Sequence, residues 1–170
     1  MSAPFRVEPL AAEHDRKAFS CGEPALDVYF QTQVTQDIRR HITNCFVATE
    51  VRTNAVAGFY TLAAASIPVH ELPAEVMKRL PRYPVLPAVR IGRLAVDHRF
   101  QGRKLGGALL ADAAARALGA APASFTLVVD AKNDATVAFY EHHGLLRLVS
   151  QPRTLFLPLA TVGKAAKPGR

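Results

Sequence analysis

Three glycines and two cations lie close together in QGRKLGGALL, the stretch from Gln101 to Leu110. They follow an apolar, strand-like run at 89–96 and precede a helix-like run at 105–118. Backbone N–H groups at a helix N-terminus lack intrahelical partners and carry the positive end of the helix dipole, so they bind phosphate without side chains. Because Gly102, Gly106 and Gly107 let a ligand approach the main chain, the stretch predicts a phosphate site. A simple tight turn explains the same residues equally well.

The glycine pattern differs from the two common nucleotide-binding motifs. Lys104 precedes the second glycine and no Ser or Thr follows, so the form GxxxxGK[ST] is absent, and GxGxxG is absent as well. His142 and His143 are neighbours on a predicted helix, where adjacent side chains diverge by about 100° and do not chelate comfortably. Cys21 and Cys45 lack metal-ligand spacing, and we interpret both as buried structural thiols. The sequence therefore predicts no metal site.

A tyrosine near the end of another predicted helix is the second candidate for chemistry. Tyr140 lies in NDATVAFYEHHG, where its phenol can act as a general acid or pack in the core, and spacing alone favours the core. Asn133 at the start of the same helix fits an N-cap. His142 and His143, followed by Gly144, fit the helix C-terminus.

The elements that position these residues change type along the chain. Residues 5–10 predict an edge strand and 21–41 an amphipathic helix with Pro24 in its first turn. Strands are expected at 44–51 and 56–67, joined by a turn at Asn54. The later predicted elements are a short helix at 74–80, a strand at 89–96, a helix at 105–118 that Gly119 ends in the left-handed conformation, a strand at 124–131, a helix at 133–143 and a final strand at 154–160. This order predicts an α/β fold with helices covering a central sheet.

The composition limits the class of protein. A chain of 170 residues suits one domain, expected over residues 1–162, followed by a basic, disordered tail at 163–170. No apolar run approaches the ~20 residues of a membrane span and the N-terminus lacks a secretory apolar core, so we expect a cytoplasmic protein with no membrane contact. The net charge of +7 and the isoelectric point near 9.8 favour nucleic acid or phosphorylated ligands, or a solubilising surface.

The stretch LAVDHRFQGRKLGGALL resembles the acyl-coenzyme A binding segment of the GNAT superfamily of N-acetyltransferases, whose pattern is Q/R-x-x-G-x-G/A. One position departs from it, because Lys104 stands where the family usually has glycine. The resemblance implies the GNAT fold, an α/β (α+β) arrangement with a mixed, mostly antiparallel central sheet, splayed central strands and flanking helices. It also implies acetyl-CoA as cosubstrate, and the residues matched to its binding are Leu94, Ala95, Val96, Gln101, Gly102, Arg103, Lys104, Leu105, Gly106, Gly107 and Asn133.

The resemblance covers nearly the whole chain and narrows to the acetyltransferase toxins of bacterial toxin–antitoxin modules. The matching stretches are FSCGEPALDVYF, VAGFYTLAAASI, LPRYPVLPAVRIGRLAVD, and VDAKNDATVAFYEHHGL with LFLPL. It implies transfer of acetyl from acetyl-CoA to the α-amino group of aminoacyl-tRNA, which stops translation, with Tyr140 as general acid. It further implies a ribbon-helix-helix antitoxin from the same operon, operator DNA bound only through the antitoxin complex, and a homodimer.

Basic side chains are the candidates for contacts to tRNA phosphates. Arg39 and Arg40 form one group, and the others are Lys78, Arg79, Arg82, Arg90 and Arg93. A solvated basic face or a docking surface for the antitoxin explains the same charges. Two other functions stay open: a GNAT acetyltransferase acting on a small amine or a protein N-terminus, and a non-catalytic anion-binding module.

Overall fold

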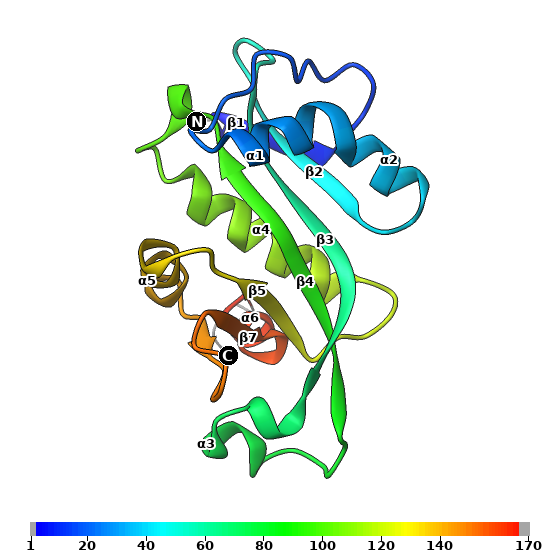
Figure 1. Cartoon of the computed structure of the whole chain (residues 1–170), viewed down its shortest axis with the longest axis vertical. Helices are drawn as coiled ribbons and strands as arrows, with labels where there is room; N and C mark the ends of the chain where they lie inside the picture. Colours follow the sequence, from blue (N-terminus) through cyan, green and yellow to red (C-terminus); the bar gives the residue numbers. More distant parts are fainter. Residues whose placement is uncertain (1–2, 167–170) are drawn as a thin grey trace. The chain divides into compact units, whose positions relative to one another are not determined.

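The computed structural model describes residues 3–166, which divide into two compact units (Figure 1). The first unit contains the residues up to Ala63 together with Gly92–Ala113, and the second contains Ala64–Ile91 and the residues from Ala114 onward. The predicted domain boundary at residue 162 stays a prediction. Helix α6, Leu159–Ala166, continues past it, and the predicted tail beyond Ala166 lies outside the described residues.

The strands form a mixed, mostly antiparallel sheet, as predicted. Within residues 3–166 they are β1 (Phe5–Pro9), β2 (Asn44–Glu50), β3 (Val56–Pro68), β4 (Val85–Val96), β5 (Thr126–Asp130), β6 (Leu146–Arg147) and β7 (Thr154–Pro158), in the order β1-β2-β3-β4-β5-β7-β6. The pairs β1–β2, β2–β3, β5–β7 and β6–β7 are antiparallel. Strand β4 pairs with β5 in parallel, from Ala88 opposite Thr126 to Ile91 opposite Val129.

The helices agree with the predicted amphipathic segments, with local differences. The helix expected at 21–41 is α1 (Pro24–Val28), the π-helical turn η1 (Tyr29–Gln33) and α2 (Val34–Arg39). The others are η2 (Val69–Glu71), α3 (Ala74–Met77), η3 (His98–Phe100), α4 (Leu105–Gly119), α5 (Asp134–His142) and α6. Between residues 3 and 166, none of these helices combines the length and apolarity that a membrane crossing requires.

Two predictions about how secondary-structure elements end were wrong. Gly119 is the last residue of α4 but is not left-handed, because the helix closes with a short-range bond from the Ala120 amide to the Ala117 carbonyl at 3.4 Å. The final strand ends at Pro158 instead of 160, and α6 follows at once. Proline has no N–H to continue a strand ladder, so the chain turns into a helix there.

In the first unit, an aromatic cluster joins the α1–α2 segment to the sheet. The rings of Phe30 and Phe59 stack with centroids 4.2 Å apart, and Phe19 packs edge-on against both. Gly58, the neighbour of Phe59 on β3, faces α4. A Cβ at this position would lie 2.9 Å from Leu109 Cδ1 and 3.0 Å from the Ala95 carbonyl oxygen. The absence of a side chain therefore lets α4 approach the strands closely, which fixes the turn that precedes this helix.

The second unit has its own apolar core, formed by residues of β3, β4, β5 and β7 that include Ile67, Leu86, Val128 and Phe156. The connection between β3 and β4 contains α3 and is anchored to this unit through Glu71. The buried Glu71 carboxylate accepts hydrogen bonds from the Ser150 amide at 3.1 Å and from the Ser150 hydroxyl. These bonds fix the start of the connection.

Candidate functional site

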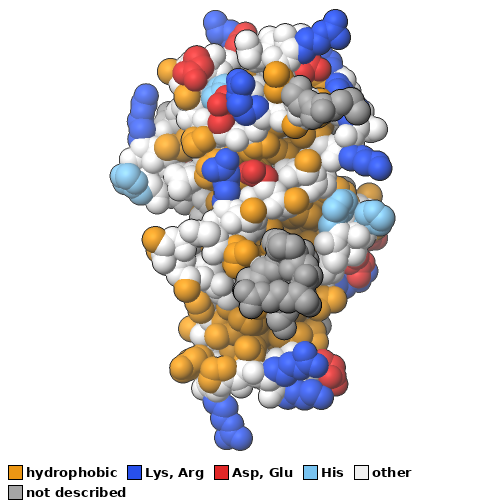
Figure 2. Space-filling model, turned by 180° about the vertical axis from the view of Figure 1, so that it is seen from behind, with side chains coloured by type: hydrophobic (Ala, Val, Ile, Leu, Met, Phe, Trp, Pro, Cys, Tyr) orange, Lys and Arg blue, Asp and Glu red, His pale blue; other side chains and the backbone are white. Residues whose placement is uncertain are grey.

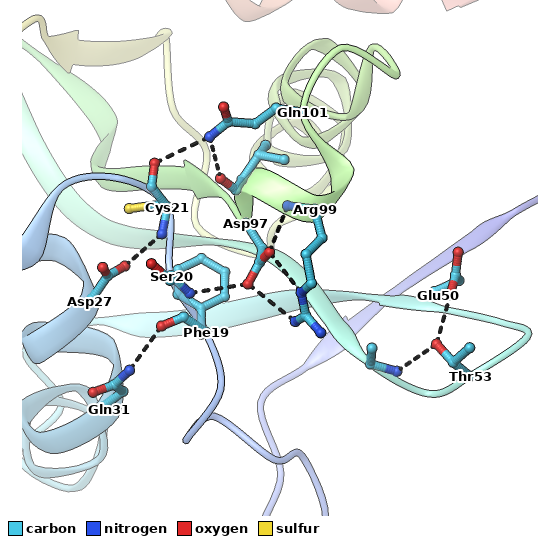
Figure 3. Close-up of polar contacts among 12 residues, drawn as sticks. Phe19, Ser20, Cys21, Asp27, Gln31, Glu50, Thr53, Asp97, Arg99 and Gln101 are labelled. Atoms are coloured by element: carbon cyan, nitrogen blue, oxygen red, sulfur yellow. Dashed lines mark hydrogen bonds and ion pairs between the residues drawn. The ribbon is translucent and has the colours of Figure 1, made fainter.

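The end of β4 leads into a turn that is held by a buried carboxylate (Figure 3). Asp97 is 1% exposed, and its side chain accepts bonds from the Ser20 amide at 3.0 Å, the Arg99 amide at 2.9 Å and the Arg99 guanidinium. Burial would raise the pKa of Asp97, but the hydrogen bonds from Arg99 and Ser20 outweigh it, so the pKa lies below its ordinary value. An ionised Asp97 therefore ties the turn to residues near the N-terminus.

Gln101 continues the same network (Figure 3). Its side-chain Nε2 donates to the Val96 carbonyl at 2.9 Å and to the Cys21 carbonyl at 3.1 Å. The amide side chain is thus occupied within the protein, and it cross-links the end of β4 to the segment before α1. The Nε2 group of Gln101 is therefore committed to the protein, and its main-chain amide is a candidate for ligand binding.

The turn itself contains two residues in the left-handed conformation. Gly102 has φ 78° and Lys104 has φ 64°. Left-handed residues in such a turn direct neighbouring amides into a concave, anion-binding arrangement, and α4 begins at Leu105 directly afterwards. The lysine thus occupies a conformation that glycine adopts more easily, at the position where the sequence departs from the GNAT pattern. Gly106 and Gly107 lie in the first turn of α4, both half-buried.

Arg103 is directed to a neighbouring part of the first unit. Its Cζ lies 4.9 Å from the centroid of the Phe5 ring and 5.8 Å from that of Phe100. One guanidinium nitrogen is 3.4 Å from Glu50. The Arg103 guanidinium thus already contacts two aromatic rings and a carboxylate. A contact between this side chain and the coenzyme stays a prediction.

Helix α5 of the second unit carries Tyr140. The residue is 4% exposed, and burial raises the pKa of its phenol to about 12. The phenol is therefore protonated at neutral pH and is available as a hydrogen-bond donor. The ring packs edge-on against Phe139, with centroids 5.1 Å apart.

The ends of α5 have the caps that the sequence indicates. Asn133 Oδ1 accepts from the Thr136 amide at 2.9 Å and from its hydroxyl at 2.8 Å, so this side chain is an N-cap. At the other end, His143 Nδ1 is 2.9 Å from the Phe139 carbonyl, and Gly144 has φ 91°. The capping role of Asn133 leaves its predicted coenzyme contact without separate support.

Two of the seven predicted RNA contacts are engaged within the protein. The Arg90 guanidinium forms an ion pair with Asp130, which also accepts from the Thr154 hydroxyl at 2.7 Å. The Cζ of Arg93 lies 3.5 Å from the centroid of the Tyr29 ring, and the Tyr29 hydroxyl donates to Asp37 at 2.9 Å. Both guanidinium groups are therefore held in position by neighbouring side chains. A contact that either of them makes with RNA would have a fixed direction.

Three more predicted RNA contacts lie in the exposed connection after α3, and Arg39 and Arg40 are exposed at the end of α2. Lys78, Arg79 and Arg82 are exposed, and Lys78 forms an exposed i,i+3 ion pair with Glu75 at 3.1 Å. Exposed pairs of this kind contribute little free energy, so the Lys78 ammonium remains available. Figure 2 shows Lys and Arg side chains beside a hydrophobic surface at this end of the second unit.

The structure thus gathers the predicted coenzyme residues from Leu94 to Gly107 in the first unit, and it puts Asn133 and Tyr140 on one helix of the second. Asp97 was not predicted to have a role. An acidic residue directly after a strand, with Arg99 two residues later, is the signal that could have identified it as a cap. Among residues 3–166, no group of three or more His, Cys, Asp or Glu residues is arranged to hold a metal ion.

A family model and several known proteins are similar to this chain. Residues 41–144 match the model described as acetyltransferase (GNAT) domain. A probable toxin TacT of Sinorhizobium fredii is 32% identical over 166 residues, covering 92% of this chain and 92% of that protein. A tRNA-acetylating toxin of Mycobacterium tuberculosis is 38% identical over 143 residues, covering 83% of this chain and 82% of that protein.

Solved structures of such toxins have the same fold. AtaT complexed with acetyl-methionyl-tRNAfMet superimposes with a TM-score of 0.86 and 28% identity, covering 96% of this chain and 99% of that chain. A Tyr-to-Phe mutant of AtaT, bound to the C-terminus of the antitoxin AtaR and to acetyl-CoA, gives a TM-score of 0.80 and 25% identity, covering 98% and 100% of the two chains.

Proposed function

Because this chain belongs to the GNAT family of acetyltransferases, we propose that it transfers acetyl from acetyl-CoA to the α-amino group of an aminoacyl-tRNA and so blocks translation. The observation that carries the proposal is the 38% identity, over 83% of this chain, with a tRNA-acetylating toxin. The basic composition, with a net charge of +7, supports an RNA substrate over a small amine.

The coenzyme is held by main-chain groups of the first unit. In this proposal, the amides of the turn from Gln101 to Lys104 and of the first turn of α4 bind the diphosphate. The amides of Leu94–Val96, which lie past the end of the β4–β5 register, pair with the pantetheine arm and face the thioester oxygen as it becomes an oxyanion. The network of Asp97 and Gln101 fixes these amides before the coenzyme binds, which lowers the entropy lost on binding.

The reaction needs a neutral amine and a stabilised leaving group. An α-amine titrates near pKa ~7.7, so a sizeable fraction is neutral at cytoplasmic pH and attacks the thioester without a strong base. The N–C bond forms, the C–S bond breaks, the amine loses a proton, and the coenzyme A thiolate must gain a proton or a hydrogen bond.

Tyr140 is the residue proposed to face the leaving sulfur. Its pKa of about 12 exceeds the ~8.5 of a thiol by about 3.5 units, so full proton transfer would be uphill by about 5 kcal/mol. Hydrogen bonding to the sulfur therefore has to supply much of the stabilisation, with solvent completing the proton transfer. The match of the relatives over the length of α5 supports this assignment.

The binding partners that we propose for this chain are inferred from those of its relatives. A relative of known structure binds the C-terminus of an antitoxin, and we propose that this chain is inhibited by a ribbon-helix-helix antitoxin from the same operon. Operator DNA would be bound only through that complex. We further propose a homodimer that acts in the cytoplasm, where charged tRNA is found.

Labelled acetyl-CoA distinguishes the substrate classes. The protein is mixed with it and with charged total tRNA, uncharged total tRNA, a polyamine or a peptide. We expect label on the charged tRNA alone. Label on the polyamine or the peptide, with none on either RNA sample, would instead identify a GNAT enzyme of small amines or protein N-termini.

Tyr140→Phe tests the catalytic assignment. The substitution keeps the ring and removes the hydroxyl, so turnover on charged tRNA should fall by roughly 10²–10⁴-fold while the Kd for acetyl-CoA changes little. Tyr60→Phe is the matched control, because Tyr60 is also buried and donates to Asp112 at 2.5 Å in the first unit. Turnover by Tyr60→Phe should stay within about 3-fold of the wild type. Wild-type turnover by Tyr140→Phe would contradict the assignment.

A further inference from the structure

The connection between β3 and β4 forms a groove of about 780 Å³ in the second unit. Its walls are largely apolar and include Val69, Met77 and Leu80, and its rim carries Lys78, Arg82 and Tyr83. A volume of this size matches sites that hold small organic ligands. The described residues that line this groove all lie between Val69 and Pro84, and none of them is a predicted coenzyme residue.

The groove is formed before any ligand arrives. Its base begins at Val69, whose amide donates to the Pro84 carbonyl at 3.1 Å and so joins the two ends of the connection. Glu71 anchors the same segment, because its carboxylate binds Ser150 and its carbonyl accepts from the Val149 amide at 2.8 Å. Pro81 and Pro84 restrict the backbone of the opposite wall. A rigid site of this kind loses little entropy on binding.

The rim combines an exposed aromatic ring with positive charge. Tyr83 is 60% exposed, so much of its ring surface is open to a ligand. The stretch from Val69 to Pro84 has three cations against two carboxylates, and one of these carboxylates, Glu71, is buried and bonded to Ser150. The groove therefore offers a flat stacking surface beside an excess of positive charge.

We propose that this groove holds one unpaired nucleotide of the RNA substrate, with its base stacked on Tyr83 and its phosphate beside Lys78 and Arg82. The inference rests on the proposed function, because RNA is the substrate named there. A nucleotide joins a planar π face to a negative charge within a few ångströms, and single-stranded RNA is bound in general by aromatic stacking next to basic groups. The tyrosine ring accepts any base, so the site contributes affinity and register without reading sequence.

An acidic peptide is the alternative occupant, and the rim argues against it. A peptide in a groove relies on main-chain hydrogen bonds or on buried apolar anchors, whereas the largest apolar side chain at this rim, Tyr83, is 60% exposed. Its exposed ring and the flanking cations match the two parts of a nucleotide.

The test measures binding in the absence of acetyl-CoA. A short single-stranded RNA with one 2-aminopurine is titrated with the wild type, Tyr83→Ala and Tyr83→Phe, with a blunt RNA duplex of equal charge and a Glu-rich, Leu-containing peptide as comparison probes. Stacking quenches 2-aminopurine fluorescence. We expect Tyr83→Ala to weaken single-strand binding by about 5- to 150-fold and to remove the quenching. Tyr83→Phe keeps the ring and should bind within about 2-fold, and duplex affinity should be equal for all three proteins.

Two results would overturn the proposal. One is single-strand binding by Tyr83→Ala that equals that of the wild type. The other is a Tyr83-dependent affinity for the acidic peptide together with Tyr83-independent RNA binding, which would assign the groove to a protein partner. The proposed function has a separate test, because it would be contradicted if the wild type left charged tRNA unacetylated. Even then, the fluorescence titration would still show whether the groove binds an unpaired nucleotide.

Discussion

At the scale of single residues, Asp97 is the carboxylate on which the turn before α4 depends. Asp97→Asn keeps the shape but replaces one acceptor oxygen with a donor, so amides of Ser20 and Arg99 lose part of their bonding. We expect the free energy of unfolding at pH 7 to fall by about 1–3 kcal/mol. Urea denaturation measures this loss, and Asp134→Asn is the control. Asp134 has 95% of its side chain exposed and pairs with Arg153 at 3.3 Å, so its replacement should cost under about 0.5 kcal/mol.

The pH dependence of the same variant checks the electrostatic cause. The pKa of Asp97 is lower in the folded state than its ordinary value, so its ionised form stabilises the protein above the unfolded-state pKa. That contribution is lost as pH falls through the folded-state pKa. The stability difference between wild type and Asp97→Asn should therefore narrow on acidification. A difference that stays constant from neutral pH down to about pH 3 would assign the loss to packing instead.

Substitutions of Lys104 separate the effect of backbone conformation on stability and coenzyme binding from the effect of the lysine charge. At φ 64° a lysine is strained by about 1–2 kcal/mol, and glycine removes this strain at an entropic cost of about 0.4–1 kcal/mol in the unfolded chain. Lys104→Gly should therefore be more stable than Lys104→Ala by about 0.5–1 kcal/mol in urea denaturation. Both variants lack the ammonium, so they should bind acetyl-CoA with equal Kd if main-chain amides hold the diphosphate. A markedly weaker Kd for Lys104→Ala alone would show that backbone conformation at this position limits coenzyme binding.

The sequence could predict the roles of some residues of the candidate site but not of others. Lys104 stands out in the printed sequence because a family pattern fixes the position where glycine is expected, and the left-handed φ explains that expectation. Asp97 and Gln101 act through Ser20, Cys21 and the end of β4. The contacts with Ser20 and Cys21 join residues that are 77 and 80 positions apart, so spacing could not indicate them, whereas the cap of Arg99 by Asp97 has a local signal.

At the scale of elements, Gly58 sets how closely α4 approaches the strands. An added methyl group would overlap Leu109 and the Ala95 carbonyl, and the latter is backbone that cannot rotate away. Gly58→Ala should therefore destabilise the protein by about 1–3 kcal/mol and weaken acetyl-CoA binding, because α4 and its N-terminal turn must shift. Urea denaturation and calorimetric titration with acetyl-CoA measure the two effects.

Gly119→Ala is the matched control for Gly58→Ala. Gly119 lies at the end of α4 with helical backbone, and a Cβ there meets no atom within 4 Å. Alanine should stabilise the protein by about 0.4–1 kcal/mol and leave the Kd for acetyl-CoA unchanged. If Gly58→Ala were as harmless as Gly119→Ala, close packing of α4 on the strands would not be what positions the turn.

Elements with strong periodicity were predicted well, and short ones were not. The segment at 21–41 contains α1 and α2, and strands are present on either side of Asn54, because long apolar runs such as the first six residues of β3 are buried. The two-residue strand β6 pairs with β7 and has too few residues for a period. The π-helical turn at Tyr29–Gln33 is likewise invisible to a pattern of period 3.6, since it is set by packing of the aromatic cluster.

At the scale of the whole molecule, the net charge left a polyanionic ligand and a solubilising surface open, and it gave no location for either. A net charge of +7 is a property of the entire chain, whereas the structure engages Arg90 and Arg93 with neighbours and leaves Lys78, Arg79 and Arg82 exposed on the β3–β4 connection. The predicted coenzyme residues from Leu94 to Gly107 and Tyr140 belong to different units, so a common role for them follows from family resemblance and not from spacing.

The double substitution of Lys78 and Arg79 with alanine tests whether the β3–β4 connection binds RNA phosphates. Each lost phosphate contact should reduce the slope of log affinity against log salt by about 0.7–0.9, so the double variant should flatten the slope for charged tRNA by about 1.4–1.8. The KM for charged tRNA should rise, whereas the Kd for acetyl-CoA should not change, because the diphosphate is assigned to main-chain amides of the first unit. Initial rates over a series of salt concentrations give the KM for charged tRNA and its salt dependence, and calorimetric titration gives the Kd for acetyl-CoA.

Lys17→Ala with Arg52→Ala removes the same charge from exposed positions of the first unit and serves as the control. A general effect of net charge would give both double variants the same change in slope, since long-range attraction depends on total charge within a Debye length of about 8–10 Å. Direct contacts predict a change for Lys78 and Arg79 alone. If that variant kept its tRNA kinetics and lost affinity only for the antitoxin, the exposed cations of the connection would belong to the inhibitor's binding surface, and the RNA path would have to run along Arg39, Arg40 and Arg93 instead.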